Sequence, residues 1–276
     1  MPRITALNIY PVKSCRGIAL EQALITTTGF AFDREWMVVG DNYRFLTQRE
    51  EPRLALIEPS LDQHHLRLRA PDMAEDLAID VDARGDQVEV VCWGDRCAAF
   101  DMGAHAADWL SEYFGTRRRL VRFDRSRKRP SSPDWTAHIE ALNQFSDGFP
   151  WLIISQGSLD DLNTRLPAPL PMNRFRPNIV IDGVEAYAED RIHEIAVGNA
   201  CLRLVKPCAR CAIPTTDQAT AERLTDQPLR ALKQYRFSRE LKGVLFGQNA
   251  ILIAGATQTL SVGQEFEIRW KAGASA

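Results

Sequence analysis

The stretch IHEIAVGNACLRLVKPCARC, residues 192–211, joins a strand pattern to two cysteines and decides how the second half of the chain folds. Two apolar runs, residues 192–197 and 201–205, flank the pair Gly198 and Asn199. Short apolar runs separated by turn-forming residues are typical of a β-hairpin. The sequence therefore predicts a hairpin whose second strand leads directly into Cys208 and Cys211.

Short apolar or alternating runs also fill most of the chain before this hairpin. Between residues 4 and 101 they are separated by Pro, Gly and Asp-Asn turns, which favours strands over helices. Residues 104–115 break this pattern, because their apolar residues share one helical face and Gly115 is a typical stop. We predict a β-rich first unit closed by a helix, followed by a mixed unit with further strands and a few helices.

The composition is that of a folded globular protein. The 276 residues contain 34 Lys and Arg and 36 Asp and Glu, and a net charge of -2 gives no overall field that attracts nucleic acid or an anionic membrane. No stretch reaches the roughly 18 to 20 apolar residues of a membrane helix, and no leader pattern begins the chain. We expect a cytoplasmic protein with reduced cysteines, which then serve as core thiols, metal ligands or reactive groups.

A basic run lies between Arg117 and Arg129, where eight Lys and Arg residues meet one acid, Asp124. One interpretation is a solvated edge strand and loop, whose cations discourage pairing with another sheet. The other is a surface that binds an anion or a partner protein. Nucleic-acid binding is disfavoured, because no aromatic residues for base stacking are interleaved with the charges.

A second candidate anion site follows the apolar run WLIIS, residues 151–155. This buried strand leads into Ser158, which we predict to cap a helix with Asp161 at its third position. A helix N-terminus offers free N–H groups to an anion, although most capped helices bind none.

Two arginines, Arg174 and Arg176, alternate with Phe175 just before another apolar strand. In an extended chain, residues two apart point to the same side, so both guanidinium groups are expected to face one way. Such a pair binds phosphate well, and the alternative is that it pairs with the acids of residues 187–190.

The cysteine pair itself has several interpretations. A redox couple needs its first cysteine at a helix N-terminus, but residues 212–217 do not start a helix. Structural zinc needs four ligands, and the other close pair, Cys92 and Cys97, has an unusual spacing. Two buried core thiols are the alternative that composition favours. Against it, Lys206 and Arg210 flank the thiols and favour thiolate.

Several motifs together resemble one family, the MOSC-domain proteins that include the mitochondrial amidoxime-reducing component and its bacterial relatives. The motifs are IYPVKSCRGIAL, GFAFDREWMVV, NRFRPNIVIDGVEAYAED, CARCAIPTTD, LFGQNAILI and LSVGQEFEI, and they cover almost the whole chain in the expected order. The resemblance implies a mainly β fold with α (α+β). It places an N-terminal MOSC β-barrel domain at residues 1–116 and a MOSC β-barrel domain with a few helices at residues 117–276.

The same resemblance implies a molybdenum cofactor, held by a pterin dithiolene and one protein cysteine, and the reduction of N-hydroxylated compounds such as amidoximes, hydroxylamines and N-hydroxylated bases. It assigns the metal thiolate to Cys211, and leaves solvent and Asp217 as the alternatives for the proton donor. A phosphate and a polar ring call for guanidinium, ammonium and N–H donors. The cofactor-binding positions it implies are Lys13, Ser14, Arg34, Ser155, Gln156, Ser158, Arg174, Arg176, Asn178 and Thr215.

The resemblance also implies partners. The sequence has no targeting segment and no ferredoxin-like extension, so we expect electrons from a separate protein of the ferredoxin-like, flavin reductase or cytochrome b5 type. The basic run at residues 117–129 is a candidate docking surface for an acidic carrier. Two other functions stay open: a molybdenum cofactor carrier or sulfur-transfer accessory protein, and a zinc-stabilised binding module.

Overall fold

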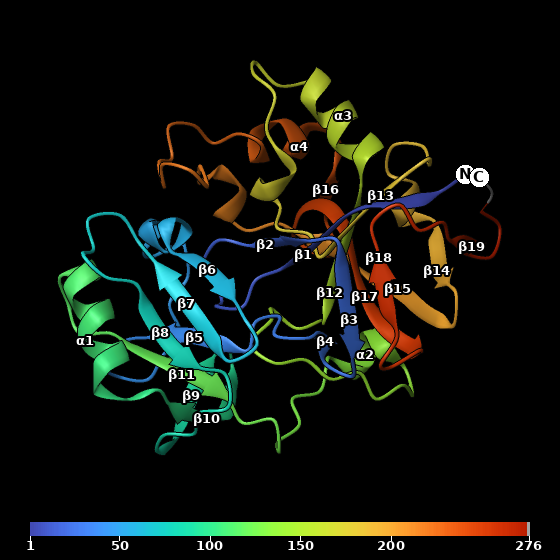
Figure 1. Cartoon of the computed structure of the whole chain (residues 1–276). Helices are drawn as coiled ribbons and strands as arrows, with labels where there is room; N and C mark the ends of the chain where they lie inside the picture. The colour runs from blue at the N-terminus through green and yellow to red at the C-terminus, as the bar shows by residue number, and fades with distance from the viewer. Residues whose placement is uncertain (275–276) are drawn as a thin grey trace.

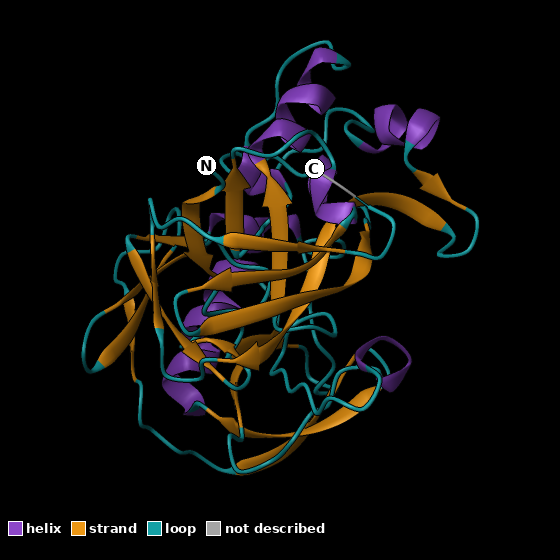
Figure 2. Cartoon of the chain, turned by 90° about the vertical axis from the view of Figure 1, so that its right-hand side faces the viewer, coloured by secondary structure: helices purple, strands orange, loops and turns teal. Residues whose placement is uncertain are grey.

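A computed structural model describes residues 1–274, and strands dominate its regular structure (Figure 2). The largest sheet has nine strands in the order β19-β14-β15-β17-β12-β13-β1-β2, with β16 paired to β17. The strands of this sheet are β1 (Arg3–Ile9), β2 (Ile18–Leu20), β12 (Trp151–Ser155), β13 (Ile179–Asp182), β14 (Ile192–Val197), β15 (Ala200–Ala209), β16 (Phe237–Ser238), β17 (Gly243–Ala254) and β19 (Glu267–Trp270).

The predicted hairpin of residues 192–205 is confirmed as β14 and β15, which pair antiparallel from Glu194 opposite Arg203 to Val197 opposite Ala200. Strand β15 is longer than predicted and continues to Ala209, because it also pairs with β17 over most of its length. The apolar side chains of these strands pack into a core that includes Ile195, Leu202 and Leu204. This packing fixes the direction in which the chain enters the cysteine pair.

The first thirty residues are built into this same body. Strand β1 pairs antiparallel with β13, and β3 (Gln22–Thr26) pairs with β18 (Thr259–Ser261) near the other end of the chain. A two-residue strand, β4 (Gly29–Phe30), extends that small sheet. In Figure 1 the blue N-terminal strands lie among the orange and red strands of the second half. The predicted domain boundary between residues 116 and 117 stays a prediction. Strands from both sides of it pair in the same sheets, as β1 does with β13.

The rest of the first half forms two smaller sheets beside the large one (Figure 1). One has the order β5-β11-β10-β9 and the other β6-β7-β8, and helix α1 (Gly103–Phe114) packs on a core that includes Trp36, Leu66 and Leu110. The mainly β fold with α is therefore confirmed. The strands are β5 (Trp36–Val39), β6 (Glu58–Leu61), β7 (His65–Arg69), β8 (Leu77–Asp80), β9 (Gln87–Cys92), β10 (Asp95–Asp101) and β11 (Arg119–Phe123).

The predicted helix at residues 104–115 is confirmed as α1, with Gly115 in the left-handed conformation (φ 68°) that commonly ends a helix. The predicted cap at Ser158 is wrong, because α3 (Gln156–Thr164) begins three residues earlier and Ser155 caps it. The sequence predicted a strand throughout residues 53–61, but the 3₁₀ helix η1 (Pro52–Leu56) precedes β6. The remaining helices are α2 (Pro133–Thr136), α4 (Leu229–Tyr235), η2 (Met172–Arg174), η3 (Ala188–Asp190) and η4 (Ile213–Thr215).

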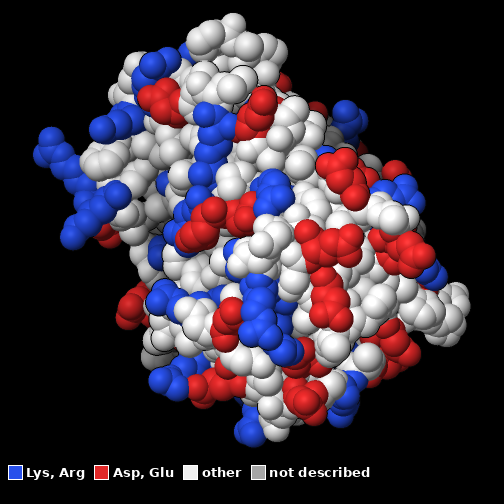
Figure 3. Space-filling model, turned by 90° about the vertical axis from the view of Figure 1, so that its left-hand side faces the viewer, with Lys and Arg blue, Asp and Glu red and all other residues white. Residues whose placement is uncertain are grey.

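The basic run is not an edge strand. Strand β11 lies inside its sheet between β5 and β10, and five of the eight cations between residues 117 and 129 form ion pairs with acids of this chain. The most buried pair joins Arg122 Nε to Glu35 Oε1 at 2.6 Å. Over the face in Figure 3, basic and acidic side chains are interspersed. Internal pairing therefore explains much of the run's charge.

Within residues 1–274, none of the helices combines the length and the apolar character needed to cross a lipid bilayer.

Candidate cofactor site

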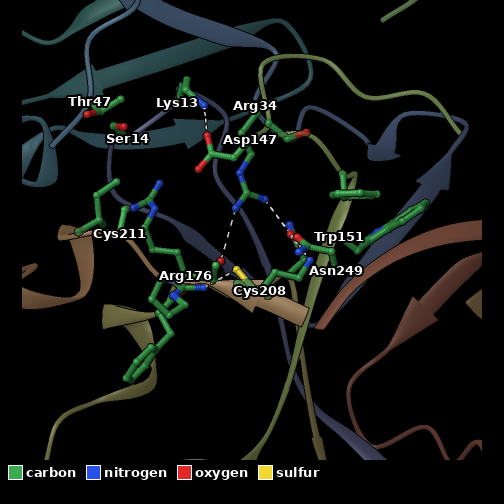
Figure 4. Close-up of a pocket in the computed structure, with 18 residues that line it drawn as sticks. Lys13, Ser14, Arg34, Thr47, Asp147, Trp151, Arg176, Cys208, Cys211 and Asn249 are labelled. Atoms are coloured by element: carbon green, nitrogen blue, oxygen red, sulfur yellow. Dashed lines mark hydrogen bonds and ion pairs between the residues drawn. The ribbon is translucent and has the colours of Figure 1, made fainter. Parts of the chain in front are cut away.

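A cavity brings both halves of the chain together next to the cysteine pair (Figure 4). Its walls come from the loop after β1, the loops on both sides of β5, the segments before and within β12, the segment before β13, the end of β15 with the residues after it, and β17. Four cationic side chains and one carboxylate line it. The lining residues that matter below are Lys13, Ser14, Arg34, Thr47, Asp147, Trp151, Arg176, Asn178, Cys208, Arg210, Cys211 and Asn249.

Three of the lining residues have an unusual backbone. Ser14 (φ 68°), Arg34 (φ 49°) and Arg176 (φ 57°) are all in the left-handed region, although none is a glycine. This conformation is uncommon for such residues and costs on the order of 1 to 3 kcal/mol each. Strain of this kind gathers at ligand-binding sites, where the surrounding structure holds the residue in place. The backbone conformation therefore indicates that this cavity is a ligand-binding site, independently of its side chains.

The conformation of Arg176 also corrects a prediction. The sequence placed Arg174 and Arg176 on one side of an extended strand, but η2 and the left-handed residue turn the chain, and the two guanidinium groups separate. Arg174 lies outside the cavity lining and donates from Nη2 to Asp217 Oδ2 at 2.7 Å. Arg176 lines the cavity.

Tyr10 contacts Arg34 and Arg176, two of the three arginines that line the cavity. The guanidinium carbon of Arg34 is 4.3 Å from the centre of its ring, and that of Arg176 is 4.2 Å away. The Tyr10 hydroxyl donates to the carbonyl of Pro177 at 3.0 Å, and burial raises the pKa of this phenol to about 12. The ring therefore remains neutral and orients both cations by cation–π contact.

The two arginines differ in their charge partners. Arg34 donates to Asp33 Oδ2 at 2.5 Å and to Asn178 Oδ1 at 2.8 Å. The Arg176 side chain is 8% exposed, and in the described part of the chain it has neither an ion pair nor a hydrogen bond. Burial lowers the pKa of Arg176 to about 10, which leaves it charged at neutral pH. A buried cation without a counter-charge is costly and fits a site that receives an anion.

The side-chain oxygen and nitrogen of Asn178 are already hydrogen-bonded within the protein, so Asn178 joins parts of the cavity wall instead of donating to a ligand. Its side-chain oxygen accepts from the Leu152 N–H (3.2 Å) and from Arg34, and its Nδ2 donates to the Asn8 carbonyl at 3.1 Å. These bonds join β1, β12 and the start of β13. Asn178 therefore holds Arg34 in place.

Lys13 and Asp147 form an ion pair in the cavity (Figure 4). Lys13 is buried and also donates from Nζ to the Phe145 carbonyl at 2.7 Å, whereas the Asp147 side chain is 62% exposed. Asp147 also accepts from the indole N–H of Trp93 at 3.1 Å. The Asp147 carboxylate is therefore paired with the Lys13 ammonium group, which an incoming anion would otherwise contact.

The two cysteines stand at the end of β15, where the chain leaves the sheet. Both line the cavity, and both are partly exposed. Arg210 Nη1 donates to Cys208 Sγ at 3.1 Å, and Arg210 Nη2 donates to the Phe175 carbonyl at 2.8 Å. Cys208 is thus engaged by a neighbouring guanidinium, while no hydrogen bond of Cys211 is found in residues 1–274.

The other thiols lie elsewhere. Cys15, Cys92 and Cys97 are buried in apolar cores, and burial raises the pKa of Cys15 to about 12, raises that of Cys97 to about 11, and raises that of Cys92. In the described residues, no three His, Cys, Asp or Glu side chains converge as a metal site. This arrangement gives no support to a zinc-stabilised module.

We expect these environments to separate the cysteines chemically. In cofactor-free protein at about pH 8, iodoacetamide should modify Cys208 and Cys211 within minutes, and Cys15, Cys92 and Cys97 only after denaturation, because they are buried and protonated. Peptide mapping by mass spectrometry measures the order. Early modification of Cys92 or Cys97 would contradict this assignment.

Several residues implied by the resemblance do not line the cavity. Ser155 and Ser158 bond to each other (Oγ to Oγ 2.7 Å), and Ser158 Oγ donates to the buried carboxyl of Glu189 at 2.7 Å. Gln156 bonds to Asp160. Thr215 Oγ1 donates to the Ala212 carbonyl at 2.8 Å. Arg174 and these four residues lie outside the lining, and their cofactor role stays a prediction. Asp217, the candidate proton donor, also lies outside it.

Other lining residues were missed by the sequence. Thr47, Asp147 and Asn249 come from three distant segments, and Arg210 was noted only as a flanking charge. A signal was present for Asp147, which stands in the turn-rich FSDGFP segment of residues 145–150. Nothing local distinguished it from an ordinary loop carboxylate.

Comparison with known proteins identifies the family of this chain. Residues 1–117 match the family described as the MOSC N-terminal beta barrel domain, and residues 141–267 match the family described as the MOSC domain. The chain belongs to the family of proteins that combine these two domains.

The individual relatives make the placement more specific. The chain is 35% identical over 265 residues to mitochondrial amidoxime-reducing component 1 of Homo sapiens, covering 90% of this chain and 78% of that protein. It is 34% identical over 254 residues to the Mus musculus protein of the same name, covering 89% and 74%. It is also 30% identical over 283 residues to molybdenum cofactor sulfurase of Bos taurus, covering 95% of this chain but 32% of that protein.

The residues present fit an anionic, sulfur-ligated cofactor. The cavity offers four cations against one carboxylate, one of those cations has no counter-charge, and the buried Nε of Arg210 and Nε1 of Trp151 lack an acceptor within residues 1–274. Two thiols stand in the same lining. The cavity has a volume of about 120 Å³ and is partly open to solvent, and the side chain of Asp147 in its lining is exposed.

Proposed function

We propose that this protein is a molybdenum cofactor-dependent oxidoreductase that reduces N-hydroxylated compounds, such as amidoximes and hydroxylamines, by removing their oxygen. The observation that carries the proposal is the position of Cys211 in a cavity whose buried Arg176 lacks a counter-charge. The names of the relatives, which include amidoxime-reducing components, support the substrate class. The overall reaction consumes two electrons and two protons and releases the reduced nitrogen compound and water.

Residues of this chain would hold the cofactor in stated ways. Cys211 would supply a thiolate ligand, because soft sulfur suits a metal already bound to dithiolene sulfurs. Arg176, Arg34 and Lys13 would contact anionic and polar groups of the pterin, with Arg176 gaining the counter-charge it lacks. When bound, the cofactor would supply the two-electron reduction and accept the oxygen of the N–O bond.

The geometry favours solvent over Asp217 as the proton source. The N–H groups of Ala219 and Thr220 and the guanidinium of Arg174 lower the pKa of Asp217, so it is a carboxylate at neutral pH. It also lies outside the cavity lining. We propose that Asp217 instead holds Arg174, which also donates to the Pro214 carbonyl in the loop after Cys211.

A separate protein is proposed as the electron donor, and the cytoplasm as the location. The basic run at residues 117–129 is a weaker docking surface than its charge implied, because Arg119, Arg122 and Arg129 are all paired internally. A small N-hydroxylated compound remains the proposed substrate, with no nucleic acid or membrane partner.

The second candidate function is a cofactor carrier or sulfur-transfer accessory protein. It is favoured by the similarity to molybdenum cofactor sulfurase, although the chain covers only 32% of that relative. A carrier binds the cofactor without turnover, which separates it from the first proposal.

Purification from cells supplied with molybdate tests both. We expect about one molybdenum and one pterin per chain, and reduction of benzamidoxime to benzamidine with a chemical electron donor. Bound cofactor without turnover of any N-hydroxylated compound would favour the carrier. Protein that takes up neither molybdenum nor pterin would end both proposals.

A further inference from the structure

Trp93 has a conformation that its turn does not favour. It is the first of two residues between β9 and β10, with φ 58°. Glycine or asparagine usually takes this position in a two-residue hairpin loop, because a left-handed backbone is strained for a bulky side chain. Trp93 is also 38% exposed, one of the few large apolar side chains at the surface. Neither turn geometry nor core packing therefore accounts for a tryptophan here.

The exposed indole forms part of a groove of about 580 Å³. Phe45, whose ring centre is 5.2 Å from that of Trp93, and Leu46 supply the other apolar surface. Arg49 lies over the indole at 4.4 Å and is held by a hydrogen bond from Nε to Thr47 Oγ1 at 3.2 Å. The groove has the size of a small-molecule site, with aromatic surface and a charged rim of Arg44, Arg49 and Glu50.

The groove adjoins the candidate cofactor site through shared groups. Lys13 Nζ is 5.8 Å from the Phe45 ring centre and 5.9 Å from that of Trp93. Asp147, which pairs with Lys13 in the cavity, accepts the hydrogen bond of the Trp93 indole. Thr47, which holds Arg49, also lines the cavity. A molecule in the groove therefore lies next to the cavity that contains Cys211.

We propose that this groove, with Trp93 as its main contact, binds the aromatic part of the substrate and so selects planar aryl N-hydroxylated compounds, arylamidoximes above all. This inference rests on the proposed function. A flat ring that replaces Arg49 over the indole, or packs against the edges of Trp93 and Phe45, gains contact area and ring–ring contacts. The exposed carboxylate of Asp147, which bonds to the indole N–H, can accept hydrogen bonds from the amidoxime NH₂ group.

The test compares two amidoximes on cofactor-loaded protein. For Trp93→Asn we expect the ratio of kcat/KM for benzamidoxime to kcat/KM for acetamidoxime to fall about tenfold. Trp93→Phe keeps a ring and should stay within about threefold of wild type. Phe237→Asn, which alters an exposed aromatic residue on β16, is the matched control and should leave the ratio unchanged.

Equilibrium binding gives a readout that does not need turnover. Calorimetry with benzamidine, the reaction product, which has no N–O bond left to reduce, should show a Kd about tenfold weaker for Trp93→Asn. The melting temperature of this variant should be no lower than that of wild type, because asparagine relieves the left-handed backbone. A purely structural tryptophan would instead lower the melting temperature and leave the Kd unchanged, which would overturn the proposal.

Two further outcomes also decide it. An effect of Trp93→Phe as large as that of Trp93→Asn would mean that the indole N–H acts by holding Asp147, and would overturn stacking. A loss confined to reduction by a protein electron donor, equal for both amidoximes, would make the groove the donor's docking surface. If wild type reduces neither amidoxime, the proposed function fails, whereas benzamidine affinity still measures the groove.

Discussion

The Cys211→Ser variant is expected to lose molybdenum and activity together, with at least a hundredfold drop in the reduction of benzamidoxime. A serine hydroxyl of similar shape is a hard donor with a high pKa, so it replaces the thiolate in volume but not as a ligand to a soft metal centre. Because Cys211 is partly exposed at the end of β15, the fold should not change, and the melting temperature should stay within a few degrees. Molybdenum is measured by plasma mass spectrometry on purified protein.

Two other cysteines of the same region make the comparison specific. Cys201 is on the same strand, partly exposed and outside the cavity lining, so Cys201→Ser should keep the wild-type molybdenum content. Cys208 holds Arg210 through its sulfur, so Cys208→Ser should reduce retention by about two- to fivefold. Full molybdenum content in Cys211→Ser, or complete loss in Cys208→Ser, would show that the wrong thiol was assigned.

The Arg176→Met variant should become more stable while it loses the cofactor. At neutral pH the buried guanidinium of Arg176 has no counter-charge, and methionine removes that unfavourable charge while filling much of the space. We expect a gain of about 1 kcal/mol in the free energy of unfolding, after allowing for the lost contact with Tyr10. The loss of a charge-assisted bond to an anion, about 1.5 to 3 kcal/mol, should weaken cofactor retention by roughly 10- to 100-fold.

The stability gained by Arg176→Met should decrease at high pH. The pKa of Arg176 is lower in the folded protein, about 10, than its ordinary value of 12.5. The charge therefore destabilises the fold fully below about pH 10, and the penalty disappears as pH rises above that value. The difference in stability between Arg176→Met and wild type should shrink above pH 10 in denaturant titrations.

Arg122 is the matched control. It is also buried, 5% exposed, but is paired with Glu35. Arg122→Met leaves the buried Glu35 carboxylate with the half-exposed Arg125 as its remaining ion-pair partner, and should cost about 3 to 5 kcal/mol, because breaking a buried pair is strongly destabilising. If both variants were destabilised equally, Arg176 would be a structural residue rather than an anion site.

Much of the fold followed from the sequence because it depends on local patterns. The hairpin predicted at residues 192–205 and the helix predicted at residues 104–115 followed from apolar spacing and from a glycine in the turn or after the helix. The wrong predictions concern elements whose place in the fold depends on tertiary contacts. Strand β11 could be internal only because Glu35, on a distant segment, neutralises Arg122.

The site was predicted less completely, for a related reason. Lys13, Arg34 and Arg176 were identified by motif, and the structure brings them into one cavity with Cys211. The alternation of Arg174 and Arg176 was misleading, because the left-handed backbone at Arg176 reverses the chain. Asp147 could not be found, because its role depends on contacts with Lys13 and Trp93, which are distant in the sequence. Thr47 could not be found, because only the fold brings its loop to the other lining segments.

The pairing of β3 with β18 joins residues 22–26 to residues 259–261. A ribosome makes the first of these strands long before the second, so the N-terminal segment must wait for its neighbours through most of translation. The residues that line the cavity likewise come from segments as far apart as Lys13 and Asn249, so its walls are complete only after most of the chain has been made. A product truncated before Asn249 would therefore lack part of the cavity wall.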